Sequence, residues 1–210
     1  MEPYVITIGR ELGSGGKAIA TLMAEQLHIP VYDRKLIQLA AQESGFSPDI
    51  FKRADETPNR GLMSHIIRNL TAPLSSFSNL YSNSLSKEAL FNVQADTIRR
   101  VAEQESCIIV GRCSDYILRN HPRHFSIFVR ANYDDRITFL QTRQHMTTDE
   151  ARQLIDRTDT LRADYHNLYA ETNWGDSRAY DLCINTSVLG IERTAHLLLD
   201  VVRSALDITD

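Results

Sequence analysis

The chain has 210 residues, of which 42% are hydrophobic and 24% charged, which is ordinary for one globular domain. Its formal net charge of -4 argues against a general nucleic-acid binder, because proteins that bind polyanions are usually basic. No apolar stretch approaches the ~18 residues of a membrane span, and the opening residues MEPYVITIGR lack the pattern of a signal peptide, which favours a cytoplasmic protein.

Strands and helices alternate along the chain. Short apolar or β-branched runs predict strands, and apolar residues repeating at helical spacing predict amphipathic helices. The predicted strands are Tyr4–Ile8, Ile29–Tyr32, Ile108–Val110, Phe125–Val129 and Leu182–Asn185. The predicted helices begin at Lys17 and span Arg34–Glu43, Glu88–Glu105, Asp134–Arg143, Thr147–Ala170 and Ile191–Leu206. This alternation predicts an α/β fold with a five-stranded parallel sheet and helices on both faces.

We interpret residues 1–210 as a single domain with two specialised segments. The stretch from about 44 to 87 is the least regular, with three prolines and the polar tract Ser75–Ser86, and is where an acceptor-binding insertion would lie. The stretch from about 145 to 175 contains a long polar helix and is the expected helical lid.

A glycine-rich segment, GRELGSGGK at Gly9–Lys17, lies between the first predicted strand and the first predicted helix. Glycines let the backbone adopt positive φ and turn its N–H groups inward, and a helix N-terminus adds partial positive charge. Such a concave set of N–H groups binds a diphosphate or triphosphate, although a tight turn without a ligand is the alternative. The predicted nucleotide-binding residues are Arg10, Gly13, Ser14, Gly15, Gly16, Lys17 and Ala18.

Four motifs in this order resemble the cytidylate kinase-like family, which is related to the bacterial cytidylate kinases. They are GRELGSGGK at 9–17, VYDRKLI at 31–37, IIVGR at 108–112 and YDLCINT at 180–186, and the resemblance runs over nearly the whole chain. It implies a P-loop nucleoside monophosphate kinase fold and ATP-dependent phosphoryl transfer, with CMP as the candidate acceptor. Mg²⁺ is expected from the nucleotide chemistry.

The glycine-rich segment departs from the standard P-loop, which reads G-x-x-x-x-G-K-[ST]. If Lys17 is the lysine of this motif, the first glycine falls at Glu11 and the hydroxyl residue at Ala18. If Gly13–Gly15 is aligned with the G-S-G of nucleotide kinases, Gly16 replaces the lysine. Either alignment removes or moves the hydroxyl that would hold Mg²⁺, and either Arg10 or Lys17 could supply the missing positive charge.

Asp33 and Arg112 are the predicted acceptor-binding residues at the carboxyl edge of the sheet, where ligands of open α/β sheets collect. Asp33 closes the second strand, and capping of the next helix is as good an interpretation as contact with substrate or Mg²⁺. Arg112 follows a buried strand and a glycine, so that its planar guanidinium could clamp a phosphate. The Gly111-Arg112 pair is similar to the Asp-Gly-Arg of cytidylate kinases, whose arginine contacts the monophosphate.

Arg157, Asp159 and Arg162 lie on the long polar helix. Asp159 and Arg162 are three residues apart, and the simple interpretation is a salt bridge on a solvated helix. D-x-x-R also resembles the lid signature of cytidylate kinases, whose arginines reach over the phosphates. The resemblance implies that Arg157 and Arg162, with Lys17, are catalytic, and that Asp159 contacts the substrate.

Two other functions stay open. The absence of Ser or Thr after Lys17 fits a nucleotide-binding regulatory protein without turnover, and an acceptor other than a nucleotide would make the chain a metabolite kinase. The cysteines have no CxxC spacing, and His145, His166 and His196 have no ligand-like spacing and are expected to be surface or partly buried residues. We therefore predict no resident metal site and a small-molecule nucleotide as the partner, with neither nucleic acid nor membrane involved.

Overall fold

A computed structural model describes residues 2–33, 36, 39 and 85–208 of the chain. Contacts divide the chain into two compact units, one of Met1–Asp33 with Ile98–Asp210 and the other of Arg34–Thr97. Apart from Leu36 and Leu39, which are helical, the predicted helix Arg34–Glu43 lies outside the described residues, as does most of the expected insertion at 44–87. Helix α5 (Leu85–Gln104) begins in the second unit and ends in the first, where Ile98, Val101 and Ala102 are buried.

The first unit is built on a five-stranded sheet in the order β2-β3-β1-β4-β5, with every neighbouring pair parallel. Its strands are β1 (Val5–Arg10), β2 (Val31–Tyr32), β3 (Cys107–Val110), β4 (His124–Arg130) and β5 (Leu182–Asn185). The predicted α/β fold with a five-stranded parallel sheet is therefore confirmed. Strand β1 runs past its predicted end at Ile8, because Gly9 and Arg10 continue the pairing with β4.

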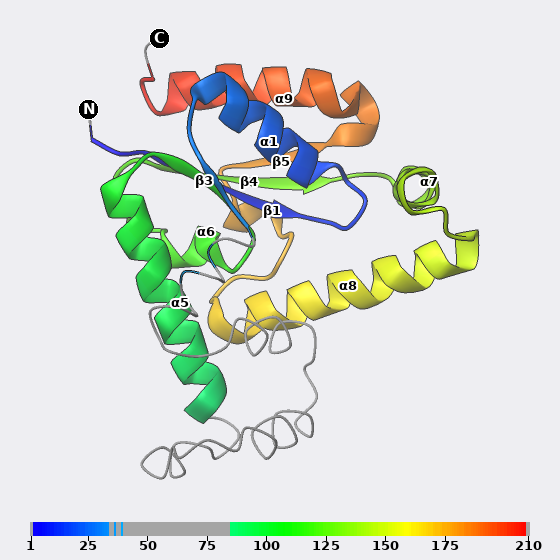
Figure 1. The fold of residues 1–210 in the computed structure, drawn as a ribbon, viewed down its shortest axis with the longest axis horizontal. Coiled ribbons are helices and arrows are strands. Elements are labelled where there is room, and N and C mark those ends of the chain that lie inside the picture. The colour runs from blue at the N-terminus through cyan, green and yellow to red at the C-terminus, as the bar shows by residue number, and fades with distance from the viewer. Residues whose placement is uncertain (1, 34–35, 37–38, 40–84, 209–210) are drawn as a thin grey trace. The chain divides into compact units, whose positions relative to one another are not determined.

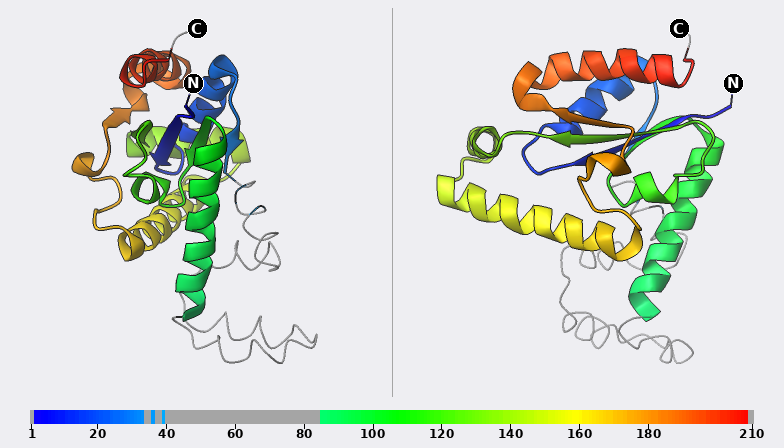
Figure 2. Two further views of the ribbon diagram at one scale, coloured as in Figure 1. Left: turned by 90° about the vertical axis from the view of Figure 1, so that its left-hand side faces the viewer. Right: turned by 180° about the vertical axis from the view of Figure 1, so that it is seen from behind.

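Helices cover both faces of this sheet (Figures 1 and 2). Helices α1 (Gly16–Leu27) and α9 (Thr186–Ala205) pack together on one face, and α6 (Ser114–Ile117) and α8 (Thr148–Tyr169) lie on the other. Helix α7 (Tyr133–Gln144) follows β4 beyond its carboxyl end, and a 3₁₀ turn, η1 (Ser177–Ala179), precedes β5. The core between the sheet and the α1–α9 layer contains Ile6, Ile8, Ile19, Met23, Ile127, Val129, Leu198 and Val202. All the carboxyl ends of the strands consequently meet along one edge.

Two helix starts differ from the sequence prediction. Helix α9 begins at Thr186 rather than Ile191, and Gly190 interrupts it with φ 76° and ψ 170°, so the predicted start corresponds to the part after the interruption. Helix α6 was not predicted, since four residues are too short to show a helical repeat. The start of α8 agrees with its sequence signal: Thr147 accepts from the Glu150 N–H, and the Glu150 carboxylate accepts from the Thr147 N–H.

His124, the first residue of β4, makes the stability of the fold depend on pH. Its Nε2 lies 2.7 Å from Oγ1 of Thr7 on β1, and burial lowers its pKa to about 4. The unfolded chain takes up a proton near pH 6.5 and the folded chain only near pH 4, so stability falls as the pH drops through this interval. We expect His124 to contribute about 2–3 kcal/mol to this loss. Urea unfolding at pH 7 and pH 4.5 should show a smaller difference for His124→Gln, and an equal difference would contradict the prediction.

Candidate active site

The glycine-rich loop leaves the central strand β1 at Arg10 and enters helix α1 at Gly16. Gly13 and Gly15 have φ values of 82° and 80°, which L side chains rarely adopt, and Gly15 is the N-cap of α1. The first N–H groups of a helix have no intrahelical partner and attract anions. With Gly15 in the cap, Gly16 is the first helical residue and Lys17 is the second.

The side chain of Arg10 lies across the loop rather than out in solvent. A Cβ built on Gly16 would come within 2.7 Å of the Cβ of Arg10, and one built on Gly111 would come within 2.0 Å of a terminal guanidinium nitrogen. The Arg10 guanidinium therefore lies against the backbone of Gly111, whose φ of 75° also favours glycine. Asp33, at the end of β2, lies 3.9 Å from the Arg10 guanidinium and accepts a hydrogen bond from Lys17 Nζ at 3.2 Å. The two cations that could replace the P-loop lysine therefore share one carboxylate.

Helix α8 contacts the loop through the two residues of its D-x-x-R motif. Asp159 Oδ1 accepts a hydrogen bond from the Leu12 N–H at 2.8 Å, and Arg162 donates to the Arg10 carbonyl at 3.0 Å. The predicted Asp159–Arg162 ion pair is present at 3.5 Å, but the helix face that carries it is turned to the loop, with 16% and 24% of the two side chains exposed. The salt bridge considered from sequence is therefore present, but it is not solvated, and both of its side chains also bond to the backbone of the loop.

Three guanidinium groups share this edge of the sheet: Arg10 from β1, Arg112 after β3, and Arg162 from α8. Burial lowers the pKa of all three, and their mutual charge contributes, since Arg10 lowers the pKa of both Arg112 and Arg162. Asp33 acts in the opposite direction on each of them. Like charges held together away from water favour binding of an anion, because the anion replaces the lost solvation.

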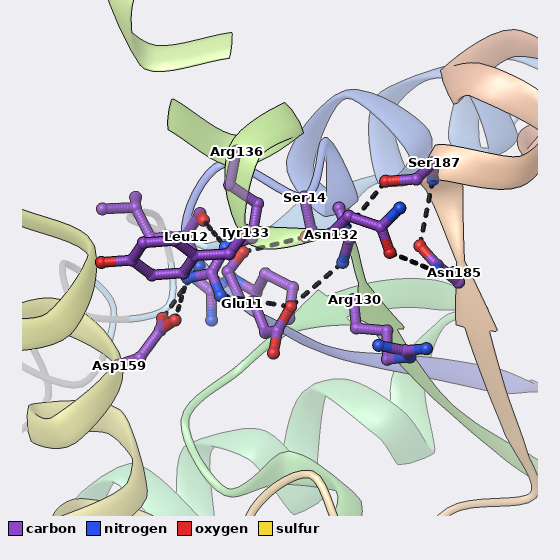
Figure 3. Close-up of polar contacts among 12 residues, drawn as sticks. Glu11, Leu12, Ser14, Arg130, Asn132, Tyr133, Arg136, Asp159, Asn185 and Ser187 are labelled. Carbon is purple, nitrogen blue, oxygen red and sulfur yellow. Dashed lines mark hydrogen bonds and ion pairs between the residues drawn. The ribbon is translucent and has the colours of Figure 1, made fainter. Parts of the chain in front are cut away.

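A second set of contacts, absent from the sequence prediction, holds the loop from the side of α7 (Figure 3). Arg136, with only 6% of its side chain exposed, donates from Nε to the Leu12 carbonyl at 2.6 Å. The same guanidinium forms ion pairs with Glu11, at 3.4 Å, and with Asp159. Glu11 also accepts a hydrogen bond from the Ala131 N–H at 3.0 Å. The sequence held one signal for this role, because Arg136 occurs four residues before Leu140 on the buried face of an amphipathic helix.

Some predicted residues have other surroundings. Ser14 is buried, and its hydroxyl donates to the Glu11 carbonyl at 2.9 Å while its own carbonyl accepts from Thr186 at 2.8 Å. Ala18 lies in the first turn of α1, where only its backbone could serve a phosphate. Arg157 is exposed and lies two residues before Asp159, about 200° around the helix, so its position does not face the loop.

His166 is buried, more completely than the surface or partly buried position expected from sequence. Its Nε2 lies 2.7 Å from Oδ2 of Asp115, with 3% and 6% of the two side chains exposed. The pair joins the last turns of α8 to α6, the short helix that follows Gly111 and Arg112. It therefore fixes the far end of α8 to the segment that follows Arg112.

The loop fits nucleotide phosphates by its positive-φ glycines, its free helix start and its flanking cations. Mg²⁺ is usually bound by one or two carboxylates together with substrate phosphates, and Asp33 is the carboxylate nearest to Lys17. The described residues contain no group of three or more His, Cys, Asp or Glu side chains that could hold a metal by themselves. They also contain no helix long and apolar enough to span a membrane.

Substitution of Gly15 should affect both the loop and the fold. A Cβ at this position would lie 2.7 Å from the side chain of Ile191 of α9, so a side chain at position 15 disturbs the packing of the loop against α9 as well as the loop itself. The positive φ adds about 1–2 kcal/mol of backbone strain. We expect Gly15→Val to lower the melting temperature and to abolish ATP binding in calorimetry. Adding Ile191→Ala should restore part of the melting temperature but not the binding; recovery of both would mean that the loop conformation is unimportant.

Comparison with known proteins identifies several solved structures that are similar to this chain. No curated protein sequence matches the chain. An uncharacterized protein from Eubacterium ventriosum ATCC 27560 has 26% sequence identity and a TM-score of 0.72, over 96% of this chain and 99% of that one. Shikimate kinase from Bacteroides thetaiotaomicron has 13% identity and a TM-score of 0.53, over 98% and 99%. Shikimate kinase from Acinetobacter baumannii, solved with shikimate, has 11% identity and a TM-score of 0.50, over 97% and 94%.

These structures show that the chain has the fold of P-loop kinases. The family model described as "Cytidylate kinase-like family" matches residues 5–188, which include the glycine-rich loop, Asp33, Arg112, Arg136, Asp159, Arg162 and the start of α9. The chain therefore belongs to the cytidylate kinase-like family.

Proposed function

We propose that this protein is an ATP-dependent kinase that transfers the γ-phosphoryl group to a nucleoside monophosphate, with CMP as the first candidate. The observation that carries the proposal is the convergence of the Arg10, Arg112 and Arg162 guanidinium groups beside the start of α1. A cluster of partly desolvated cations at a glycine loop suits two phosphate-bearing ligands better than one. A cytoplasmic location, where ATP is available, accompanies this proposal.

Each part of the site has a defined task in such a transfer. The N–H groups of Gly13 to Ala18 and the charge of Arg10 bind the ATP phosphates, and Lys17 is released from Asp33 to join them. Arg112 holds the acceptor, assisted by Asp33. Arg162 stabilises the negative charge that spreads over the group in transfer. Bound Mg²⁺ would neutralise charge on the ATP phosphates.

Two other functions are each supported by one observation. The absence of Ser or Thr after Lys17 supports a protein that binds nucleotide without turnover. The likeness of fold to shikimate kinases supports a metabolite kinase, because an arginine cluster binds a carboxylate as well as a phosphate.

A coupled assay of ADP release separates the three. It would use Mg²⁺, ATP and a panel of nucleoside monophosphates and small carboxylate metabolites, shikimate included. Turnover with a nucleoside monophosphate supports the proposal, and turnover with a metabolite alone replaces it. ATP binding in calorimetry with no turnover for any acceptor identifies a regulatory binder. Arg10→Met should abolish the activity, whereas Arg119→Met, at an exposed arginine beside Tyr116, should leave it unchanged and serves as the matched control.

A further inference from the structure

The peptide groups of Leu12 lie at the centre of the contacts between the loop and helices α7 and α8. The Leu12 N–H donates to Asp159 at 2.8 Å, and the Leu12 carbonyl accepts from Arg136 Nε at 2.6 Å. Arg136 and Asp159 are themselves joined by an ion pair. One residue of the loop is thus held on both its donor and its acceptor by a pair of side chains from two helices (Figure 3).

Helix α7 also contacts the residues on either side of Leu12, which are Glu11 and Gly13. Glu11 is paired with Arg136 through its carboxylate at 3.4 Å. A Cβ on Gly13 would meet the carbonyl oxygen of Arg136 at 2.9 Å, so the backbone of α7 lies directly against this glycine. Three consecutive loop residues are therefore fixed by α7 before the chain reaches the N–H groups at the start of α1.

We propose that Arg136 and Asp159 are positioning residues that clamp the Leu12 peptide and so hold the loop in its nucleotide-binding conformation. The inference rests on the proposed function for its consequence, tighter ATP binding, but the clamp itself is a property of the nucleotide-free protein. Neither side chain has to touch the nucleotide. Each acts by limiting the conformations of Leu12 and Gly13. A loop that adopts its nucleotide-binding conformation for only a fraction of the time binds ATP with an affinity reduced by that fraction, so limiting these conformations raises the affinity.

The clamp also links the loop to α8. Asp159 and Arg162 lie on one face of this helix, and Arg162 donates to the Arg10 carbonyl at 3.0 Å. The loop is consequently held by Arg136 on one side of Leu12, by Asp159 on the other, and by Arg162 at its first residue. Loss of the clamp should change the environment of Arg162 as well as that of the phosphates.

Amide hydrogen exchange in the absence of nucleotide tests the clamp directly. The Leu12 amide would be followed in protein labelled at leucine and assigned by its absence in Leu12→Met. Asp159→Ala removes the acceptor and should raise the Leu12 exchange rate about tenfold or more, whereas Asp159→Asn keeps an acceptor oxygen and should preserve the protection. Asp164→Ala, at an exposed aspartate of the same helix, is the matched control and should change nothing. Equal exchange in Asp159→Ala and the parent would overturn the proposal.

Calorimetry with ATP and Mg²⁺ tests the consequence. Arg136→Lys keeps the charge but cannot reach Leu12, Glu11 and Asp159 together, so the variant should fold and bind ATP about tenfold more weakly. Asp159→Ala should weaken binding to a similar extent. If exchange rises while the Kd for ATP stays within about twofold of the parent, positioning is not the role of these residues. If the parent itself binds no ATP, the proposed function fails, and the exchange rates still decide whether the clamp exists.

Discussion

Arg162→Ala should lower kcat by about 10³-fold or more, with a much smaller change in the KM of either substrate. An arginine that stabilises the transferring phosphoryl group acts mainly in the transition state, so its loss is seen in kcat. Arg112→Ala should instead chiefly raise the KM of the acceptor, since in the proposed function that arginine holds the acceptor in ground and transition states alike. Steady-state kinetics of the parent and both variants, with ATP and the acceptor varied in turn, measure these effects.

The stability of Arg162→Ala provides an independent check. The Arg162 guanidinium is desolvated and lies close enough to Arg10 for like charge to lower its pKa, and burial is the larger cause of the shift. Its removal relieves that repulsion, and Asp159 keeps Arg136 as a partner. The melting temperature should therefore stay the same or rise while kcat falls, as is common where a functional residue is held at a cost to stability. A variant with full kcat would show that Arg162 only links α8 to the loop.

Under a regulatory role the same variants behave differently. A binder without turnover would show no kcat in the parent, and Arg162→Ala would change only the affinity for nucleotide. A metabolite kinase would keep the effect of Arg162 but show it with a different acceptor. Kinetics of these variants therefore separate the catalytic role of Arg162 from the identity of the acceptor.

The backbone of the site could be predicted from sequence because its signals are local. A β-branched run, four glycines and an amphipathic helix in succession are enough to predict the strand, loop and helix from Val5 to Leu27. Asp33 and Arg112 were found by the same reasoning, since the carboxyl ends of parallel strands meet at one edge of the sheet. These inferences need the order of elements but not their packing.

The contacts that hold the loop could not be predicted in this way, because they join residues far apart in the chain. The separation between Leu12 and Asp159 is 147 residues, and that between Leu12 and Arg136 is 124. Asp159 was found only as part of a charged pair, and its bond to the Leu12 N–H has no signature in the sequence around either residue. Arg157 was included because it resembles a lid arginine, although its position on the helix turns it away from the loop.

Arg136→Met should lower the free energy of unfolding by about 3–5 kcal/mol, because it removes one member of a buried ionic group and leaves the others. Methionine retains much of the volume of the arginine stem, so the loss is electrostatic more than steric. Without the guanidinium, Glu11 and Asp159 are two carboxylates that have lost their shared cation, and the Leu12 carbonyl loses its donor. Urea unfolding at neutral pH, followed by circular dichroism, measures the change.

Adding Asp159→Asn to Arg136→Met should restore part of the stability, since it removes a carboxylate that has lost Arg136 and keeps only the longer ion pair with Arg162, while an oxygen remains for the Leu12 N–H. Asp159→Asn alone should destabilise, because Arg136 then keeps only Glu11 as a partner. The two substitutions must therefore be less than additive, with an interaction energy of about 1–3 kcal/mol. Arg143→Met, at an exposed arginine of the same helix, is the control and should change stability by about 0.5 kcal/mol or less. Strict additivity of Arg136→Met and Asp159→Asn would mean that these side chains stabilise the fold separately and do not act as one buried ionic group around Leu12.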